Sequence, residues 1–254
     1  MAPEEHPWEP EVWIDDGPVR EAAAGAVARG SGLPRAGSSG RPAKVPAELA
    51  GELERAVGAT QAAKLGERLA NARRAFERER YQDARPLLVP VAQEAPDVAA
   101  VRELLGLTLY RLERWKAAAA ELEAYARLSG SVDQLPVLAD CYRALRRYKK
   151  VDELWAELRA VSPPGPIMAE GRIVAAGALA DQGDLKGAIA VLERSTVAPK
   201  KIREHHLRQW YVLADLYDRA GETPRSRALF ERIRAVDPSF ADVAGRLRQL
   251  GREL

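Results

Sequence analysis

Three histidines and one cysteine are the side chains in this 254-residue chain best suited to nucleophilic or metal chemistry. His205 and His206 are neighbours, so on a helix they point about 100° apart and do not form the i,i+4 pair that chelates a metal. They favour a polar connection between helices, and His6 lies far from both in the sequence. Cys141 has no second cysteine for a disulfide or a redox pair, which favours a buried structural thiol.

The chain also lacks the short motifs that mark common catalytic sites. It has no glycine-rich phosphate loop, no GxSxG elbow and no HExxH pair. The glycines of GSGLPRAGSSG (30–40) stand among Ser, Pro and Arg, which is typical of a linker. Carboxylates such as Glu121 and Glu123 favour solvated helix faces. We therefore predict that the protein is not an enzyme and uses no cofactor or metal.

Two basic clusters favour a different chemistry, the binding of phosphate backbones. YRALRRYKK (142–150) holds five basic residues and two tyrosines, and PKKIREHHLR (199–208) adds a second cluster. Basic patches that contain aromatic rings can bind phosphates and stack bases. A solvated turn is the simpler interpretation of both clusters. Nucleic-acid binding through 143–150 and 200–208 therefore stands as the alternative function.

The composition indicates the elements that must position these residues. Apolar residues make up 46% of the chain and charged residues 30%, and alanine and arginine, both strong helix formers, are abundant. The longest uncharged apolar run is IVAAGALA (173–180), far short of the roughly 20 residues needed to cross a bilayer. The acidic N-terminus has no apolar stretch of the kind found in secretory signals. We expect a cytoplasmic, all-α protein.

A repeat explains most of the chain. Tyr81, Trp115 and Tyr148 begin similar segments and lie 34 and 33 residues apart. Small residues recur nine positions before each aromatic (Ala72, Gly106, Ala139), and small or short residues recur three positions after it (Ala84, Ala118, Val151). Small residues let two antiparallel helices approach closely at their crossing point. Two further units, at 170–195 and 207–238, show the same order with looser spacing.

The last unit resembles a tetratricopeptide repeat most clearly, through Trp210, Leu213, Ala214, Tyr217, Phe230 and Pro238. The arginine- and alanine-rich style is similar to that of tetratricopeptide-repeat (TPR) proteins found in actinobacteria. The resemblance implies a right-handed superhelical solenoid of about five helical hairpins. The predicted organisation is a tail at 1–45 and an array at 46–254, with one helix near 46–58, repeats at 65–98, 99–131, 132–165, 169–202 and 207–238, and a cap at 239–254. Pro90 is expected to kink or shorten its helix.

The resemblance also implies a partner site, because the first helices of such arrays line a concave groove that receives a peptide or a partner helix. The positions that correspond to that groove are Arg73, Phe76, Leu107, Tyr110, Arg111, Asp140, Arg143, Ile173, Asp181, Tyr211, Asp215, Asp218 and Arg219. Arg73, Arg111 and Arg143 would form a basic ladder suited to carboxylates. The asparagine–lysine clamp of chaperone-binding members is missing, since its positions hold Arg73, Leu107 and Asp140.

The N-terminal tail, residues 1–45, is the part that the repeat does not explain. PWEPEVWIDD (7–16) contains Trp8 and Trp13, and the first sixteen residues carry six carboxylates and no Lys or Arg. A short helix is expected at 18–30 and a linker after it, with a reach of roughly 20 Å. We predict that the two tryptophans are anchors that dock on this protein's own groove or on a separate partner.

The sequence thus predicts a protein–protein interaction scaffold that binds a peptide or partner protein in its groove. The RNA- or nucleoprotein-associated factor is the alternative, and an array that self-associates through its end helices is a third. No membrane partner is expected.

Overall fold

The computed structural model describes residues 45–194, 199 and 201–251, and these contain α-helices and no strand. A first helix, α2 (Ala47–Val57), precedes five helical hairpins. The hairpins are α3 (Ala59–Glu77) with α4 (Tyr81–Glu94), α5 (Ala99–Arg111) with α6 (Trp115–Ser129), α7 (Leu135–Ala144) with α8 (Tyr148–Val161), α9 (Gly165–Asp181) with α10 (Leu185–Glu193), and α11 (Glu204–Arg219) with α12 (Thr223–Val236). Helix α13 (Val243–Leu250) packs on α12. The predicted all-α solenoid of about five hairpins is therefore confirmed.

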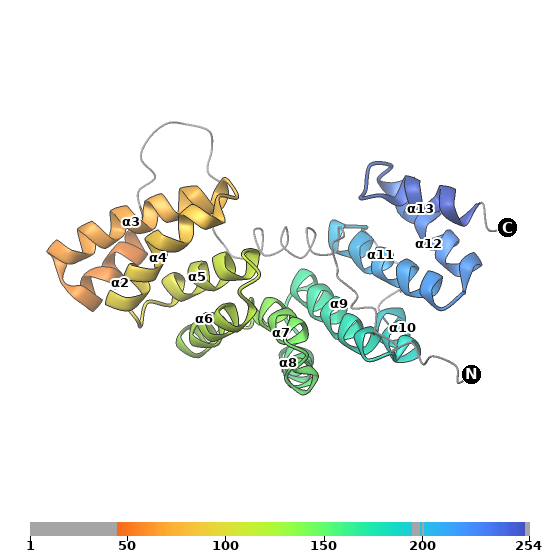
Figure 1. Ribbon diagram of the computed structural model, residues 1–254, viewed down its shortest axis with the longest axis horizontal. Helices are drawn as coiled ribbons and strands as arrows, with labels where there is room; N and C mark the ends of the chain where they lie inside the picture. Colours follow the sequence, from red (N-terminus) through yellow and green to blue (C-terminus); the bar gives the residue numbers. More distant parts are fainter. Residues whose placement is uncertain (1–44, 195–198, 200, 252–254) are drawn as a thin grey trace, which may run out of the picture.

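The hairpins follow one another along a curved path (Figure 1). Helices α5 and α7 lie on the inner side of the curve, with α6 and α8 on the outer side. Each first helix also contacts the first helix of the next hairpin, from α3 to α11. We call the surface formed by α3, α5, α7, α9 and α11 the inner face. No helix among the described residues is long and apolar enough to span a membrane.

Small residues allow the close packing within a hairpin. A Cβ atom at Gly106 of α5 would lie 2.8 Å from the Leu122 side chain of α6, closer than real Cβ atoms approach their neighbours. Ala72 and Ala84 are both fully buried at the crossing of α3 and α4. Ring pairs also link the two helices of the first two hairpins, with centroids 5.3 Å apart for Phe76–Tyr81 and 5.4 Å apart for Tyr110–Trp115.

The two helices of each hairpin are joined by a three-residue turn whose middle residue has positive φ. This residue is Glu79, Glu113, Arg146, Gly183 or Gly221, with φ values of 59°, 59°, 55°, 83° and 76°. Because only glycine adopts this region without steric cost, the first three turns hold mild strain that the last two avoid.

Four local expectations differ from the structure or lie outside it. Helix α4 contains both Pro86 and Pro90 and still runs 14 residues, the length of α8 and α12, so of the two expected effects of Pro90 the shortened helix is wrong, while the kink stays a prediction. The first hairpin begins at Ala59, six residues before the predicted start of the repeat. His205 and His206 lie in the first turn of α11 rather than in a connection. The predictions for the tail, including Trp8, Trp13 and the helix at 18–30, fall outside the described residues.

Candidate functional site

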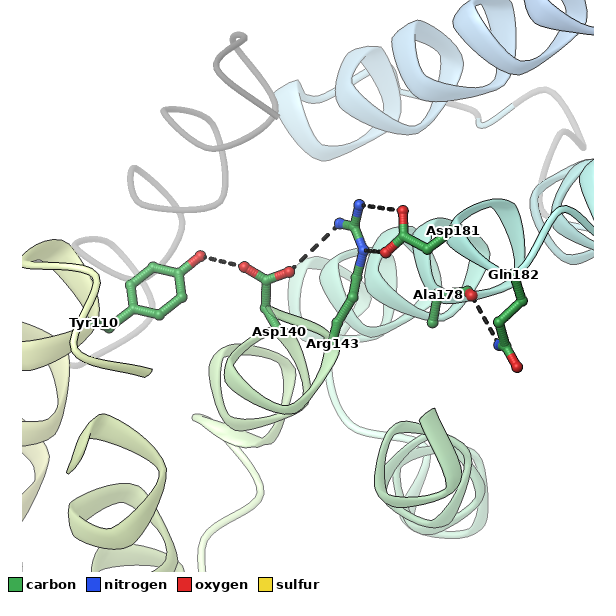
Figure 2. A network of polar contacts seen from close by, with 6 residues as sticks. All are labelled: Tyr110, Asp140, Arg143, Ala178, Asp181 and Gln182. Carbon is green, nitrogen blue, oxygen red and sulfur yellow. Dashed lines mark hydrogen bonds and ion pairs between the residues drawn. The ribbon is translucent and has the colours of Figure 1, made fainter. Parts of the chain in front are cut away.

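The inner face is held together at its centre by a polar network from three successive first helices (Figure 2). The Tyr110 hydroxyl of α5 donates to Asp140 Oδ2 of α7 at 2.7 Å. Arg143, also on α7, donates from Nη1 to Asp140 Oδ1 at 3.5 Å. Its Nε and Nη2 donate to the two oxygens of Asp181, at the end of α9, at 2.7 and 3.2 Å. One guanidinium thus lies between two carboxylates.

This network depends on a glycine in α9. A Cβ atom at Gly177 would lie 2.7 Å from Arg143 Cζ and 2.8 Å from its Nη1. The missing side chain therefore makes the space in which the guanidinium reaches Asp181. Since Arg143 is 9% exposed, its two-point contact with Asp181 is better shielded from water than a surface ion pair.

Further polar contacts join neighbouring repeats on either side of this centre. Gln134 Nε2 donates to Glu103 Oε1 at 2.8 Å, and burial raises the pKa of Glu103 to about 6. Arg208 of α11 donates to Glu170 Oε2 of α9 at 2.5 Å, and both side chains are buried. Such contacts fix the register between hairpins more specifically than apolar packing does.

At the C-terminal end of the array, a second guanidinium binds two aspartates. Arg246 of α13 donates from Nη2 to Asp215 Oδ1 at 2.7 Å and to Asp218 Oδ2 at 3.0 Å. The Tyr211 hydroxyl donates to Asp242 at 2.6 Å, and burial, followed by this hydrogen bond, raises the pKa of Tyr211. The cap helix therefore contributes a cation to the inner face.

The predicted groove residues divide into three groups. Leu107 and Ile173 are core residues, 0% and 3% exposed, which does not favour contact with a partner. The buried residues in polar contacts are Tyr110, Arg143 and Tyr211. The residues with larger exposed area are Arg73, Phe76, Arg111, Asp140, Asp181, Asp215, Asp218 and Arg219.

Two members of the predicted basic ladder already make contacts within the chain. Arg143 binds two carboxylates of the chain itself, and Arg111 Cζ lies 4.8 Å from the centroid of the Tyr81 ring. Glu103 and Glu170 were not predicted as part of this face, and Arg208 was predicted only as a member of a basic cluster. Each lies about one helical turn before a predicted groove residue on the same first helix, and that spacing is the signal that could have found it.

The two basic clusters are smaller in the structure than in the sequence. Arg143 and Arg208 are buried in ion pairs, so neither is available to a phosphate. Tyr142 is buried and its hydroxyl donates to Glu123. Among the described residues of the two clusters, the cations that stay exposed are Arg146, Arg147, Lys149, Lys150, Lys201 and Arg203.

Cys141 and His206 occupy structural positions, while His6 lies outside the described residues. Cys141 is fully buried, and burial raises the pKa of its thiol. His206 Nδ1 accepts a hydrogen bond from the Arg203 backbone N–H at 2.9 Å. Across residues 45–194, 199 and 201–251, no three His, Cys, Asp or Glu side chains gather in a way that could hold a metal ion.

Comparison with known proteins agrees with this architecture. The tetratricopeptide repeat profile matches residues 69–132, from α3 to the connection after α6. A thermophilic TPR protein of Thermus thermophilus has a similar structure, with a TM-score of 0.56 and 18% sequence identity over 73% of this chain and 98% of that chain. No curated protein matches the sequence. The chain is thus a solenoid that contains tetratricopeptide repeats.

Proposed function

We propose that this protein is an interaction scaffold that binds a segment of another protein along its inner face. The observation that carries the proposal is the continuous surface of α3, α5, α7, α9 and α11, whose exposed side chains are mixed in charge rather than apolar. Such a surface recognises a peptide through hydrogen bonds and ion pairs as well as shape. The proposal places the scaffold in the cytoplasm and gives it no catalytic role.

The charges of the inner face also suggest the chemistry of the partner. Arg73 and Arg111 lie at the α3–α5 end, and neither makes an ion pair with another described residue. At the centre, Asp140 and Asp181 share one arginine, and Asp215 and Asp218 share another near the cap. A peptide with carboxylates at one end and Lys or Arg side chains further along would complement this order.

A capture experiment with matched charge reversals tests the proposal. Three baits are used in lysate of the native host: the full chain, the inner-face variant Arg111→Glu/Asp218→Lys, and the variant Glu157→Lys/Lys186→Glu on the second helices α8 and α10. Each variant preserves net charge, and all four residues are half-buried or exposed. We expect specific proteins that survive nuclease and are lost about tenfold or more only with the inner-face variant. Equal loss with both variants, or recovery that disappears with nuclease, contradicts the proposal.

A further inference from the structure

The turns of the first three hairpins carry exposed cations. In the turns before α4, α6 and α8, the residue after the positive-φ position is arginine, whereas before α10 and α12 it is Asp184 or Glu222. We call six exposed cations in or next to the three turns the basic turn surface: Arg78, Arg114, Lys116, Arg146, Arg147 and Lys149; Arg80 is left out because it pairs with Asp83. Among the described residues, none of the six forms an ion pair through its side chain.

These turns follow one another along one edge of the array. The hairpins repeat the same three-residue turn and stack through their first helices, which keeps the turns on the same side. Arg111, just before the second turn, lies over the ring of Tyr81, just after the first. The first two turns also hold exposed Glu77, Glu79 and Glu113, but residues 144–151 hold no carboxylate. The excess of positive charge is therefore greatest at the turn between α7 and α8.

The inner face has less to offer an additional acidic segment. Arg143 binds Asp140 and Asp181, Arg208 binds Glu170, and Arg246 binds two aspartates. A carboxylate that approached any of these three arginines would have to displace one that already belongs to the fold, so within the predicted basic ladder only Arg73 and Arg111 remain for an acidic segment. The turn cations require no such exchange.

From these observations we propose that the acidic N-terminal segment, residues 1–16, binds the basic turn surface rather than the inner face. The segment carries Glu4, Glu5, Glu9, Glu11, Asp15 and Asp16 and no Lys or Arg, so its charge complements the turns. The proposal refines the predicted docking of Trp8 and Trp13. It does not depend on the inner face binding a partner.

The geometry of the chain permits this contact. The described structure begins at Val45, whose Cγ2 lies 3.9 Å from the Cβ position of Gly66 on α3. Arg78 is twelve residues further along, or about 18 Å at the rise of an α-helix. The helix predicted at 18–30 spans about 20 Å at the rise of an α-helix, and the 14 residues of 31–44 have a root-mean-square reach of roughly 19–22 Å as a flexible linker. The segment therefore reaches the first turn and extends toward the next two.

The tryptophans add a second kind of contact. Guanidinium groups bind the faces of aromatic rings, and this chain already does so where Arg232 Cζ lies 3.8 Å from the centroid of the Trp210 ring. Trp8 and Trp13 contact the turn arginines in the same way while the neighbouring carboxylates form ion pairs. The docked segment shields the exposed cations from other polyanions. It leaves the inner face accessible.

Zero-length cross-linking of the full chain with a carbodiimide tests the proposal, because it joins carboxylates only to amines in direct contact. Residues 1–20 form one tryptic peptide that contains all six carboxylates. We expect this peptide to be linked to Lys116 and Lys149 in the monomer, and not to the exposed Lys64, Lys186 or Lys201. The yield should fall steeply in 0.5 M salt.

Two charge-reversal variants provide the matched control. Arg114→Glu/Arg146→Glu/Arg147→Glu should lower the yield about tenfold, while Lys201→Glu/Arg234→Glu/Arg248→Glu, also exposed but at the other end, should leave it unchanged. Unchanged helical circular dichroism shows that both variants fold. Cross-links equally to all lysines, none to the turns, or only in dimers would overturn the proposal.

Discussion

The two halves of the array are stabilised in different ways. From α2 to α8 the helices share one apolar cluster, which extends to Val174 and Ala178 of α9. From α9 to α13 the apolar residues form two smaller clusters, one around α9 and α10 and one around α12 and α13, and both include residues of α11. Between α9 and α11 lie the buried Arg208–Glu170 pair and a hydrogen bond from Arg172 to Gln209. The N-terminal half thus relies on continuous packing, and the C-terminal half on polar pairs whose partners must both be present.

The largest expected effect comes from breaking the buried pair between α9 and α11. Arg208→Met leaves the Glu170 carboxylate without its main cation, so we expect a loss of about 3–5 kcal/mol in the free energy of unfolding. Urea denaturation measures it. The matched control is Glu170→Met/Arg208→Met, which removes both charges and should recover most of that loss. If the double variant is as unstable as the single one, the loss does not come from leaving the Glu170 charge without its partner.

A smaller loss is expected when space is removed beside Arg143. Gly177→Ala places a methyl group where the guanidinium lies, so the guanidinium must shift and its contact with Asp181 weakens, at a cost of about 1–3 kcal/mol less the roughly 0.5–1 kcal/mol that alanine adds to a helix. Gly51→Ala in α2 is the control, because no atom lies within 4 Å of its Cβ position, and alanine there should stabilise the helix by about 0.5–1 kcal/mol. Equal changes in both variants would mean that the glycine at 177 does not serve the network.

The two halves should also respond in opposite directions to pH. Burial raises the pKa of Glu103 to about 6, with Asp133 adding to the rise and Gln134 and Arg73 opposing it. The native state binds the Glu103 proton more tightly than the unfolded state does. Glu103 therefore contributes most to stability below pH 4.5. Up to about 2 kcal/mol of stability is then lost as pH rises to 6 and above. Glu103→Gln should remove this loss from the pH dependence of the urea midpoint.

His205 gives the opposite dependence in the C-terminal half. Burial is the main cause of its lowered pKa, about 4, with the neighbouring His206 and Arg203 acting in the same direction and Glu204 against them. Since the native state resists protonation, stability is present above pH 6.5 and falls as pH drops toward 4. His205→Gln should flatten that fall. Parallel pH profiles for the two single variants would contradict this assignment.

The smallest effect is expected at the hairpin turns. Arg146→Gly relieves a positive φ of 55° and should raise stability by about 1 kcal/mol, whereas Gly183→Ala introduces the same strain and should lower it by about 1 kcal/mol. The thermal midpoints of the two variants, measured side by side, check both signs. A fall with Arg146→Gly would mean that the turn tolerates arginine without strain.

The repeat itself was predictable from the sequence. Close helix crossings require small residues, and Ala72, Gly106 and Ala139 recur at the 34- and 33-residue spacing of a helical-hairpin repeat. The inner-face network was not predictable in this way. From the sequence, Arg143 was equally suited to bind a partner's carboxylate or one within the chain. The structure shows that it binds Asp181, which lies 38 residues further along. The full length of helix α4 was not predictable from Pro86 and Pro90 alone, because the packing of Leu88 and Val91 outweighs the hydrogen bonds that the prolines remove.

The central claim, that partners bind along the inner face, is tested most directly by photocross-linking from defined positions in the full chain. A photoreactive residue at Phe76 or Asp218 samples the inner face, and one at Glu157 samples the outer side of α8. Irradiation in host lysate should yield the same discrete protein adducts from both inner positions and none from Glu157. Adducts only from Glu157, or the same set from all three positions, would contradict binding along the inner face.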